Sequence, residues 1–404
     1  MDDSPIPFDH DSQVDDILRI DDDDRYSRLR LISWWRQERL AAAKVLVVGA
    51  GALGNEVLKN LALLGVGTTY LIDLDEVEPS NLSRSVLFRA EDGGRAKAEV
   101  AAQRAMEINP EAVVHPIRGD VITDLGLGLF AEMDVVIGCL DNREARLWVN
   151  RQCWKVNIPW VDAGIQEIQG VVRVFVPPDS ACYECGMTSR DYQLLNLRYS
   201  CPLLRREDIL AGKVPTAPTI ASMMAALEVQ EALKLIHGMP VQAGCLLVFN
   251  GVTNQFYTTQ LPRRDACLSH ETYPEPLALP IGNQATASEL FDLARPHLRP
   301  GPLTLVLDRD LVTAIEWPQS GKRVEVFRPR TKVGMAEAVD PETGQAGRPE
   351  TVCEIPEDSP LIGRTLADLG IPPYDIMRVD GSEGTGFFLL ASDRAGVGLP
   401  GSPR

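Results

Sequence analysis

A glycine-rich turn lies between a stretch that predicts a buried strand and a stretch that predicts a helix. The strand is Lys44–Val48 (KVLVV), the turn is GAGALG, and the helix is Asn55–Leu64. Glycines at this position permit a tight turn and allow a phosphate to approach the helix N-terminus. The context favours an α/β fold of the dinucleotide-binding type, with Gly49, Gly51 and Gly54 as nucleotide-binding residues.

The same alternation of strand and helix continues over the next two hundred residues. Alternation of this kind predicts a parallel sheet with right-handed crossovers, and hence a doubly wound, Rossmann-like core. The expected helices are Arg25–Leu40, Arg95–Ile108 and Pro218–His237, and the expected strands are Thr69–Asp73, Asp134–Gly138, Pro159–Gly164 and Gly170–Val176. Leu246–Asn250 and Gln255–Thr259 predict a hairpin.

A change in composition at Ser269–Pro280 (SHETYPEPLALP) predicts a boundary, because this stretch is a poor helix and a poor strand. We therefore expect an acidic tail at 1–24, a large domain at 25–275 and a smaller, strand-rich α+β domain at 276–404. In the smaller domain we expect strands at Leu303–Leu307, Arg323–Phe327, Thr351–Ile355, Asp375–Val379 and Gly386–Leu390, a short helix at Leu361–Leu369 and a loop at Arg328–Pro349.

Charge and composition exclude several classes of partner. The net charge is −17, and residues 1–24 alone contain ten Asp against one Arg. Because affinity for nucleic acid comes mainly from clustered Lys and Arg, a nucleic-acid partner is not expected. Neither a long apolar run nor a secretion signal is present, which excludes membrane association and predicts a cytoplasmic location.

Polar residues that suit a nucleotide follow the second predicted strand. Asp73 ends that strand 19 residues after Gly54, where it can bind a ribose hydroxyl, as it would in a NAD-dependent dehydrogenase. Asp75, Asn81, Arg84 and Lys97 come next, and two cations with an amide suit a triphosphate better than a nicotinamide. Asp141 follows the strand Asp134–Gly138 and can serve Mg²⁺.

Four linked segments, GAGALG, LIDLDEVEPSNLSR, GRAKAEVA and GCLDNREARLWVN, resemble the ThiF/MoeB/ubiquitin-activating superfamily over roughly residues 25–270. The resemblance implies ATP-dependent adenylation, with Asp73 on the ribose, with Asn81, Arg84 and Lys97 on the phosphates, and with Asp141 on Mg²⁺. It also implies a homodimer in which Arg28 reaches the neighbouring protomer's site.

Each of these side chains also has a structural alternative. Arg84 and Lys97 could be solvated surface charges, and Asp141 could cap the helix that follows it. Arg28 could form an intramolecular salt bridge or be exposed to solvent.

Two pairs of residues have the spacing of a zinc knuckle. Cys182 and Cys185 form the first pair, and Cys267 and His270 form the second, 82 residues after Cys185. Two short-spaced pairs can close a tetrahedral Cys₃His site, so we expect structural Zn²⁺ here, with packed thiols and an unrelated His as the alternative.

Cys201 is the candidate nucleophile. It lies in a polar stretch with Arg198, Arg205 and Arg206 nearby, and such cations lower a thiol pKa. Its position resembles the region in which activating enzymes carry the thioester cysteine, although no cysteine immediately precedes Val214-Pro215-Thr216. An ordinary buried thiol is the alternative.

Two functions fit the sequence. The first is an activating enzyme that adenylates the Gly-Gly tail of a ubiquitin-like protein, forms a thioester on Cys201 and passes the acyl group to a conjugating enzyme. The second is a sulfur-carrier adenylyltransferase that stops at the adenylate. The segment CEIPED after Val352 is acidic where a rhodanese persulfide loop needs glycine and Arg, so a recruiting role for the smaller domain favours the first.

Overall fold

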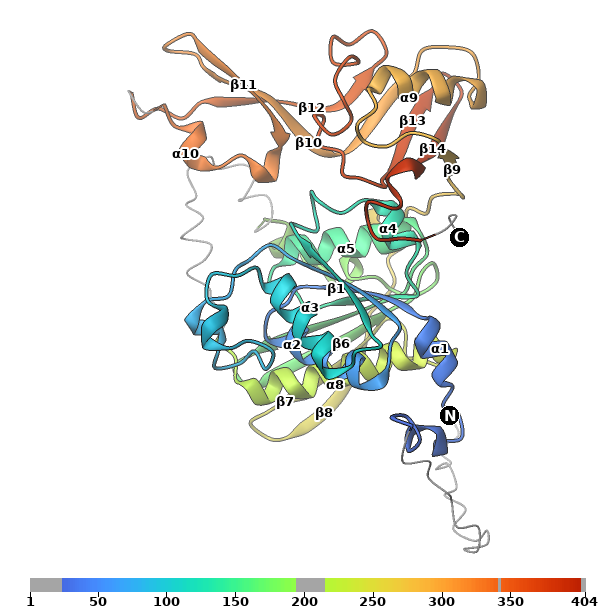
Figure 1. Cartoon of the computed structure of the whole chain (residues 1–404). Helices are drawn as coiled ribbons and strands as arrows, with labels where there is room; N and C mark the ends of the chain where they lie inside the picture. The colour runs from blue at the N-terminus through green and yellow to red at the C-terminus, as the bar shows by residue number, and fades with distance from the viewer. Residues whose placement is uncertain (1–23, 194–214, 341–342, 401–404) are drawn as a thin grey trace, which may run out of the picture.

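The computed structural model describes residues 24–193, 215–340 and 343–400. Two sheets organise these residues (Figure 1). The first sheet has eight strands in the order β3-β2-β1-β4-β5-β6-β7-β8, and it belongs to an N-terminal unit, residues 24–275. Its strands are β1 Lys44–Val48, β2 Thr68–Asp73, β3 Val113–Arg118, β4 Val135–Gly138, β5 Trp160–Gln166, β6 Gln169–Phe175, β7 Cys245–Asn250 and β8 Gln255–Gln260.

The N-terminal unit is doubly wound, as predicted. The neighbours from β3 to β5 pair in parallel, and β5 to β8 pair antiparallel. Successive residues of β1 alternate between two apolar cores, because side chains of a strand point to opposite faces. The helices of this unit are α1 Gln37–Ala42, α2 Ala52–Leu64, α3 Lys97–Ile108, α4 Leu127–Ala131, α5 Arg143–Lys155 and α8 Pro218–His237.

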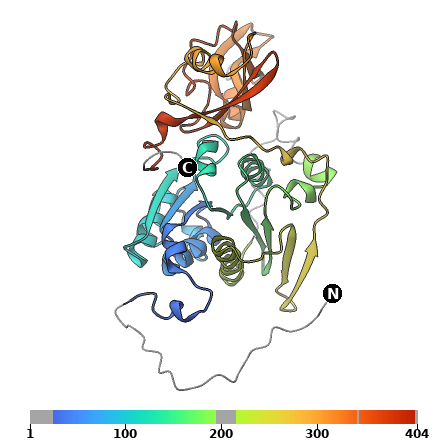
Figure 2. The same cartoon turned by 90° about the vertical axis from the view of Figure 1, so that its right-hand side faces the viewer.

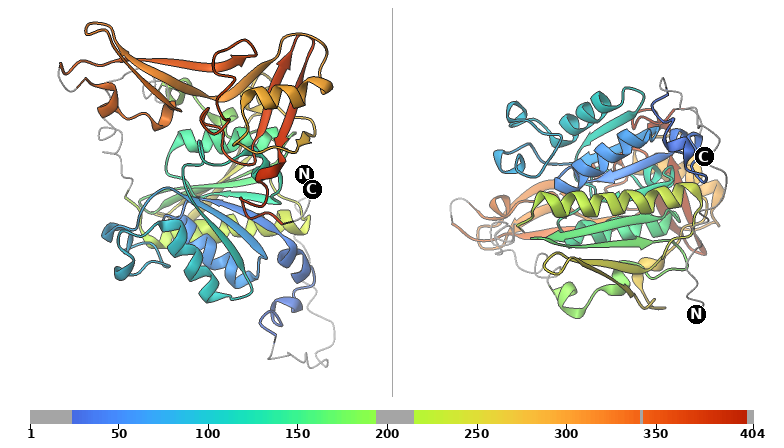
Figure 3. Two further views of the ribbon diagram at one scale, coloured as in Figure 1. Left: turned by 45° about the horizontal axis from the view of Figure 1, so that its top comes forward. Right: turned by 90° about the horizontal axis from the view of Figure 1, so that it is seen from below.

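Helices cover the two faces of this sheet unequally. Helices α2, α3 and α8 pack on one face, and Figure 3 shows α2 and α8 side by side across the strands. On the other face α4 and α5 contribute Leu127, Phe130 and Trp154 to the second core. That second core also takes up residues from the C-terminal part of the chain. None of the helices in the described part of the chain is long and apolar enough to cross a membrane.

The C-terminal unit, residues 276–400, contains the second sheet, with the strand order β11-β10-β13-β14-β9 and β12 paired to β10. Figure 2 shows this unit on top of the N-terminal unit. Its strands are β9 Leu277–Leu279, β10 Thr304–Trp317, β11 Lys322–Pro329, β12 Arg348–Pro356, β13 Ile376–Gly381 and β14 Gly384–Leu390. Its helices are α9 Ala287–Ala294 and α10 Met335–Ala338.

Short 3-10 helices connect the larger elements. They are η1 Leu29–Leu31, η2 Pro79–Asn81, η3 Ala90–Asp92, η4 Glu184–Gly186, η5 Leu268–His270, η6 Arg295–His297, η7 Arg330–Lys332 and η8 Ala391–Asp393.

Two of the predicted helices are wrong. The stretch Arg25–Leu40 is broken into η1 and α1, because Ile32 is extended and the N–H of Arg36 donates to His237 Nε2 at 3.2 Å. The indole of Trp35 is buried in the first core, so tertiary packing overrides the helical pattern. Leu361–Leu369 forms turns and buries Leu366 and Leu369 under the second sheet.

The two units share one buried interface. Asp375 Oδ1 accepts a hydrogen bond from the N–H of Leu127 at 2.6 Å, so the C-terminal unit caps the first turn of α4. The approach is close: a Cβ on Gly126 or Gly128 would lie 2.4 Å from a backbone oxygen of the facing segment. Tyr374, held at φ +57°, and Leu389 complete the second core of the N-terminal unit. The chain therefore buries residues of both units in one apolar cluster.

Candidate functional site

The glycine turn lies where β1 ends and α2 begins. Gly49 has φ +102°, a conformation that favours glycine, and a Cβ there would lie 2.5 Å from the carbonyl oxygen of Cys139. A Cβ on Gly54 would lie 1.9 Å from the Gly49 oxygen. Gly51 is the N-cap of α2 and has open space around it. The turn thus brings the unpaired N–H groups of the helix start to the carboxyl edge of the sheet, where an anion can bind.

Asp73 lies beside this turn at the end of β2. Its Oδ2 accepts from the N–H of Ala50 at 2.7 Å, and its Oδ1 accepts from the N–H of Asp75 at 2.8 Å. Burial raises the pKa of Asp73, and the hydrogen bond from Ala50 and the charge of Lys97 offset this only in part. The carboxyl group is therefore fixed against the glycine turn, at the position that the sequence predicts for a ribose contact.

Lys97 lies on the other side of Asp75. Its Nζ forms an ion pair with Asp75 Oδ2 at 2.8 Å, and its backbone N–H donates to the Asp75 carbonyl at 2.9 Å. The residue is only 9% exposed, so the interpretation of Lys97 as a solvated surface charge is wrong. A buried ammonium at the start of α3 is available to offset negative charge at this edge of the sheet.

Asn81 and Arg84 lie in the segment between Asp75 and α3. Asn81 is buried, and its Oδ1 accepts from the N–H of Glu78 at 2.9 Å, which closes the turn at η2. The Arg84 guanidinium donates to the Ser80 carbonyl at 2.8 Å and is half-buried. Both side chains thus stabilise the turn that follows Asp73 and Asp75 in the chain.

Asp141 does not cap the helix that follows it. The cap is Asn142, whose Oδ1 accepts from the N–H of Ala145 at 2.8 Å, so the structural alternative for Asp141 is wrong. Asp141 is exposed, and no hydrogen bond or ion pair joins its carboxylate to the residues that the structure describes. Strand β4 lies next to β1 in the sheet and runs parallel to it. Asp141 follows β4 and the glycine turn follows β1, so both lie at the carboxyl edge of the sheet.

An arginine that the sequence analysis missed, Arg146, holds the loop of Asp141, and its side chain is only 13% exposed. Arg146 donates through Nη2 to the Leu140 carbonyl at 2.5 Å and through Nε to Asp162 Oδ1 at 2.9 Å. Asp162 is fully buried and also accepts from Arg173 Nη1 at 2.6 Å. The signal was Asp162 itself, which is the one charged residue of strand β5, because a buried charge needs a partner.

The two cysteine pairs meet, as predicted. The ligand atoms of Cys182, Cys185, Cys267 and His270 all lie within 4.8 Å of one another. Sγ of Cys182 lies 3.5 Å from Sγ of Cys267, and Sγ of Cys185 lies 3.4 Å from Nε2 of His270. The alternative of an unrelated surface His is therefore wrong. Three thiols and one imidazole in this arrangement match the donor set of a tetrahedral zinc site.

The surroundings of this cluster connect it to α5. The buried carboxylate of Glu184, between the two cysteines of the first pair, forms an ion pair with Arg151 at 3.0 Å and accepts from the hydroxyl of Tyr192 at 2.8 Å. The N–H of Tyr183 donates to Asn150 Oδ1 at 2.9 Å. The helix that begins beside Asp141 is thus fixed in its middle by the cysteine cluster.

Comparison with known proteins agrees with this geometry. The ThiF family matches residues 24–269. This chain belongs to the ThiF family. It is 33% identical over 251 residues to the sulfur carrier protein ThiS adenylyltransferase of Escherichia coli (strain K12), covering 60% of this chain and 93% of that protein. The resemblance inferred from the four sequence segments is confirmed.

Proteins with other names match as well. Ubiquitin-like modifier-activating enzyme 5 of Arabidopsis thaliana is 28% identical over 268 residues, and the match spans 61% of this chain and 60% of that protein. The crystal structure of E. coli MccB with ATP has a TM-score of 0.51 and 26% identity, covering 63% of this chain and 75% of that one. The doubly wound fold class is confirmed, and the whole C-terminal unit lies outside the ThiF match.

Two predicted site residues of this ThiF family member remain to be placed. Arg28 is exposed at the start of η1, and it forms no ion pair with the described residues, so of its two structural alternatives the intramolecular salt bridge is absent there and solvent exposure is present. Cys201 lies outside the described residues, together with the three arginines that the sequence places near it.

Proposed function

We propose that this ThiF family chain uses ATP to adenylate the C-terminal Gly-Gly carboxylate of a small ubiquitin-like protein. One observation carries the proposal: a fixed carboxyl group (Asp73) and a buried lysine paired with an exposed acid (Lys97 with Asp75) lie beside a glycine turn at the carboxyl edge of the sheet. The named activity of the E. coli relative, adenylation of a sulfur carrier protein, supports it. The match to a modifier-activating enzyme supports the ubiquitin-like class of substrate.

In the proposed adenylation, different residues of the site contact different parts of ATP. A carboxylate oxygen of the carrier attacks the α-phosphorus of ATP, the bond to the β-phosphate oxygen breaks, and pyrophosphate leaves. Asp73 would hold the ribose, and Lys97, Arg84 and Asn81 would offset charge on the phosphates. Asp141 has the hard oxygen donor that Mg²⁺ needs, and such an ion would neutralise phosphate charge when bound. The acyl-adenylate then stays in the site for the next step.

A thioester on Cys201 is the step that we infer next. The thiolate attacks the acyl carbon, AMP leaves, and the acyl group can pass to the thiol of a conjugating enzyme. The second candidate is a sulfur-carrier adenylyltransferase that stops at the adenylate. The match to the ThiS adenylyltransferase favours it, since 93% of that protein is covered. The extra C-terminal unit, which could recruit a conjugating enzyme, favours the thioester.

Pyrophosphate exchange tests the proposal. We expect exchange of labelled pyrophosphate into ATP that requires Mg²⁺ and a carrier ending in Gly-Gly, and no exchange with the same carrier lacking those two glycines. With the competent carrier, a non-reducing gel should show a thiol-sensitive adduct that Cys201→Ala abolishes while exchange continues, because adenylation does not use the sulfur.

Cys353→Ala is the matched control for that substitution, because Cys353 is exposed on β12 and should leave the adduct intact. Exchange without any adduct would support the sulfur-carrier candidate. If no ubiquitin-like carrier stimulates exchange, the proposed substrate class is wrong.

We also infer a homodimer with Arg28 acting in the partner's site. Its exposure, and the lack of an ion-pair partner in the described part of the chain, leave the guanidinium accessible to a second protomer. Leu31 and Ile32, which are 46% and 37% exposed, follow it by three and four residues and could be covered by the same contact. The free thiols among the described residues fit the reducing cytoplasm as the location.

Structural zinc is the cofactor that we infer for the cluster of Cys182, Cys185, Cys267 and His270. Freshly purified protein should contain about one zinc per chain, because this donor set closes a tetrahedron. Cys185→Ser should lower the melting temperature by about 10 °C, since a structural zinc contributes folding free energy. Metal analysis and thermal unfolding measure both effects.

Cys353→Ser provides the comparison, because that exposed thiol is far along the chain from the cluster and should change neither value. Protein that contains no zinc when prepared without chelators would contradict the assignment.

A further inference from the structure

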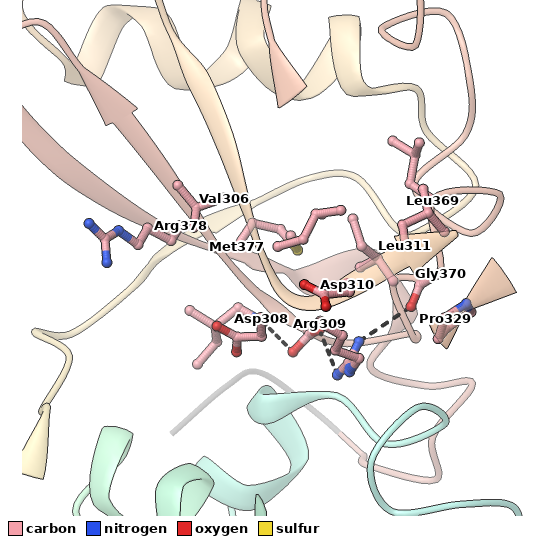
Figure 4. A pocket seen from close by; sticks show the side chains of 14 residues that line it. Val306, Asp308, Arg309, Asp310, Leu311, Pro329, Leu369, Gly370, Met377 and Arg378 are labelled. Atoms are coloured by element: carbon pink, nitrogen blue, oxygen red, sulfur yellow. Dashed lines mark hydrogen bonds and ion pairs between the residues drawn. The ribbon is translucent and has the colours of Figure 1, made fainter. Parts of the chain in front are cut away.

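The C-terminal unit holds helix α5 through an irregular segment of β10. The pairing of β10 with β12 shifts between Val306 and Leu311, which leaves the intervening residues outside the ladder. Figure 4 shows Asp308 and Arg309 of this bulge on the side of the sheet that faces the N-terminal unit. The adjoining cavity holds about 20 Å³, room for little more than one water, so it is no substrate site.

Both bulge residues contact α5. Asp308 Oδ2 forms an ion pair with Lys155 Nζ at 2.6 Å, and the Arg309 guanidinium lies 4.9 Å from the ring centroid of Trp148. Trp148 and Lys155 are seven residues apart, about two helical turns, so they lie on one face of the helix. The contact is therefore a two-point attachment along a single helix face.

Arg309 also fixes a second element at the same edge. Its Nε donates to the Ile122 carbonyl at 2.5 Å, in the loop that follows β3. That loop starts at Gly119, whose N–H donates to the Asp73 carbonyl at 3.2 Å. The Arg309 side chain is only 12% exposed and lies 3.7 Å from Asp375, so it is a fixed group of the interface. Arg309 thus contacts both helix α5 and the loop whose first residue bonds to Asp73.

The helix that the C-terminal unit contacts is the one that Asp141 precedes in the chain. Helix α5 begins one residue after the Asn142 cap, and Asp141 precedes Trp148 by another seven residues. The exposed Asp141 carboxylate has no described side chain to hold it, so its position depends on the loop and on the helix. Arg146 fixes the loop, and the bulge and the cysteine cluster fix the helix.

We propose that Asp308 and Arg309 are positioning residues for the adenylation site, which set the place of α5 and so of Asp141. This inference rests on the proposed function, because Asp141 receives its role as Mg²⁺ ligand there. The C-terminal unit then positions a residue of the nucleotide site, in addition to any recruiting role.

Two measurements on the full-length protein test this inference. Affinity for the ATP analogue AMPCPP is measured by calorimetry with Mg²⁺ and again with EDTA, and hydrogen exchange of the first turn of α5 is measured without nucleotide. Asp308→Asn and Arg309→Met should each weaken affinity in Mg²⁺ by about tenfold, as for groups that orient a metal ligand. The affinity in EDTA should stay unchanged, and exchange in α5 should become faster.

Controls separate positioning from general destabilisation. Arg299→Met removes an exposed ion pair with Glu383 in the same unit and should change neither readout. The double variant Asp308→Lys with Lys155→Asp restores opposite charges and should recover part of the Mg²⁺-dependent affinity. Recovery relative to Asp308→Lys alone would assign the loss of affinity to the ion pair between these two side chains.

Several results would overturn the inference. Unchanged exchange in α5 would show that the bulge does not hold the helix, and faster exchange with unchanged affinity in Mg²⁺ would show that Asp141 does not depend on it. Equal weakening in Mg²⁺ and in EDTA would mean that the effect does not pass through the metal ligand. If the wild type bound no nucleotide, the proposed function would fail, and exchange alone would decide whether the bulge holds α5.

Discussion

Lys97→Ala should reduce pyrophosphate exchange by on the order of a hundredfold or more, comparable to the loss of one preorganised electrostatic contact. The ammonium of Lys97 is buried at the start of α3 and fixed by Asp75 at 2.8 Å, so it needs no rearrangement to meet a developing negative charge. Exchange rates at saturating carrier, with ATP varied, measure the effect.

Folding should survive this substitution. Asp75 is 57% exposed in its side chain, so water can solvate the carboxylate that loses its partner. Lys59→Ala is the matched control, because it also removes a lysine paired with an acid, Glu56, but on the helix that follows the glycine turn. Unchanged exchange in Lys97→Ala, at an unchanged melting temperature, would mean that the phosphate site is assigned wrongly.

The sequence predicted the parallel core well, because its strands are buried on both faces. KVLVV, TYLID and DVVIG are short apolar runs, and each forms a strand within one residue of the predicted bounds. The glycine turn and Asp73 follow from those strands, since a residue at the end of a parallel strand lies at the carboxyl edge of the sheet. The cysteine cluster was predictable from ligand spacing alone.

Elements that depend on distant contacts were not predicted. Strand β3 carries no clear apolar run, and α4 has five residues, with its first turn capped by Asp375, 248 positions away. Helix α9 was missed although Thr286 and Glu289 form a capping box, which is a local signal that could have found it. Strand β10 was predicted only in its first part, because Asp308 to Asp310 interrupt its apolar pattern.

The attachment of the two units was also beyond sequence reasoning. Arg309, Tyr374 and Arg394 read as ordinary polar residues of a small domain, and only the fold shows that each of them contacts the N-terminal unit. A domain boundary at a change in composition therefore says little about whether the parts move independently. The shared second core and the buried ion pairs indicate that the units are packed firmly together.

Glu132 is a buried acid at the interface between the two units. Its carboxylate is 4% exposed and forms ion pairs with Arg394 of the C-terminal unit and with Lys44, the latter at 3.1 Å. Oε1 also accepts from the hydroxyl of Tyr374 at 3.1 Å. Burial alone would raise the pKa of Glu132, but the hydrogen bonds from Arg394 and Lys44 outweigh it and lower the pKa from 4.5 to about 2.

Glu132→Gln should therefore lower the free energy of unfolding at pH 7 by about 3–5 kcal/mol, because it removes the negative charge that pairs with the buried guanidinium of Arg394. Denaturant unfolding of the full-length protein measures the loss. Glu91→Gln, which removes an acid that is 72% exposed and lies 3.8 Å from Arg104, should cost less than about 1 kcal/mol.

The pH dependence gives an independent check on the same residue. A folded pKa below the unfolded value means that the stability contributed by Glu132 is fully present above about pH 4.5 and is lost as the pH falls toward 2. The difference in stability between wild type and Glu132→Gln should therefore shrink across that window, because the carboxylate of the unfolded wild type becomes protonated there while that of the folded protein stays ionised until about pH 2. A difference that stays constant down to pH 3, or one below about 1 kcal/mol at pH 7, would show that the two units are joined mainly by their apolar contacts.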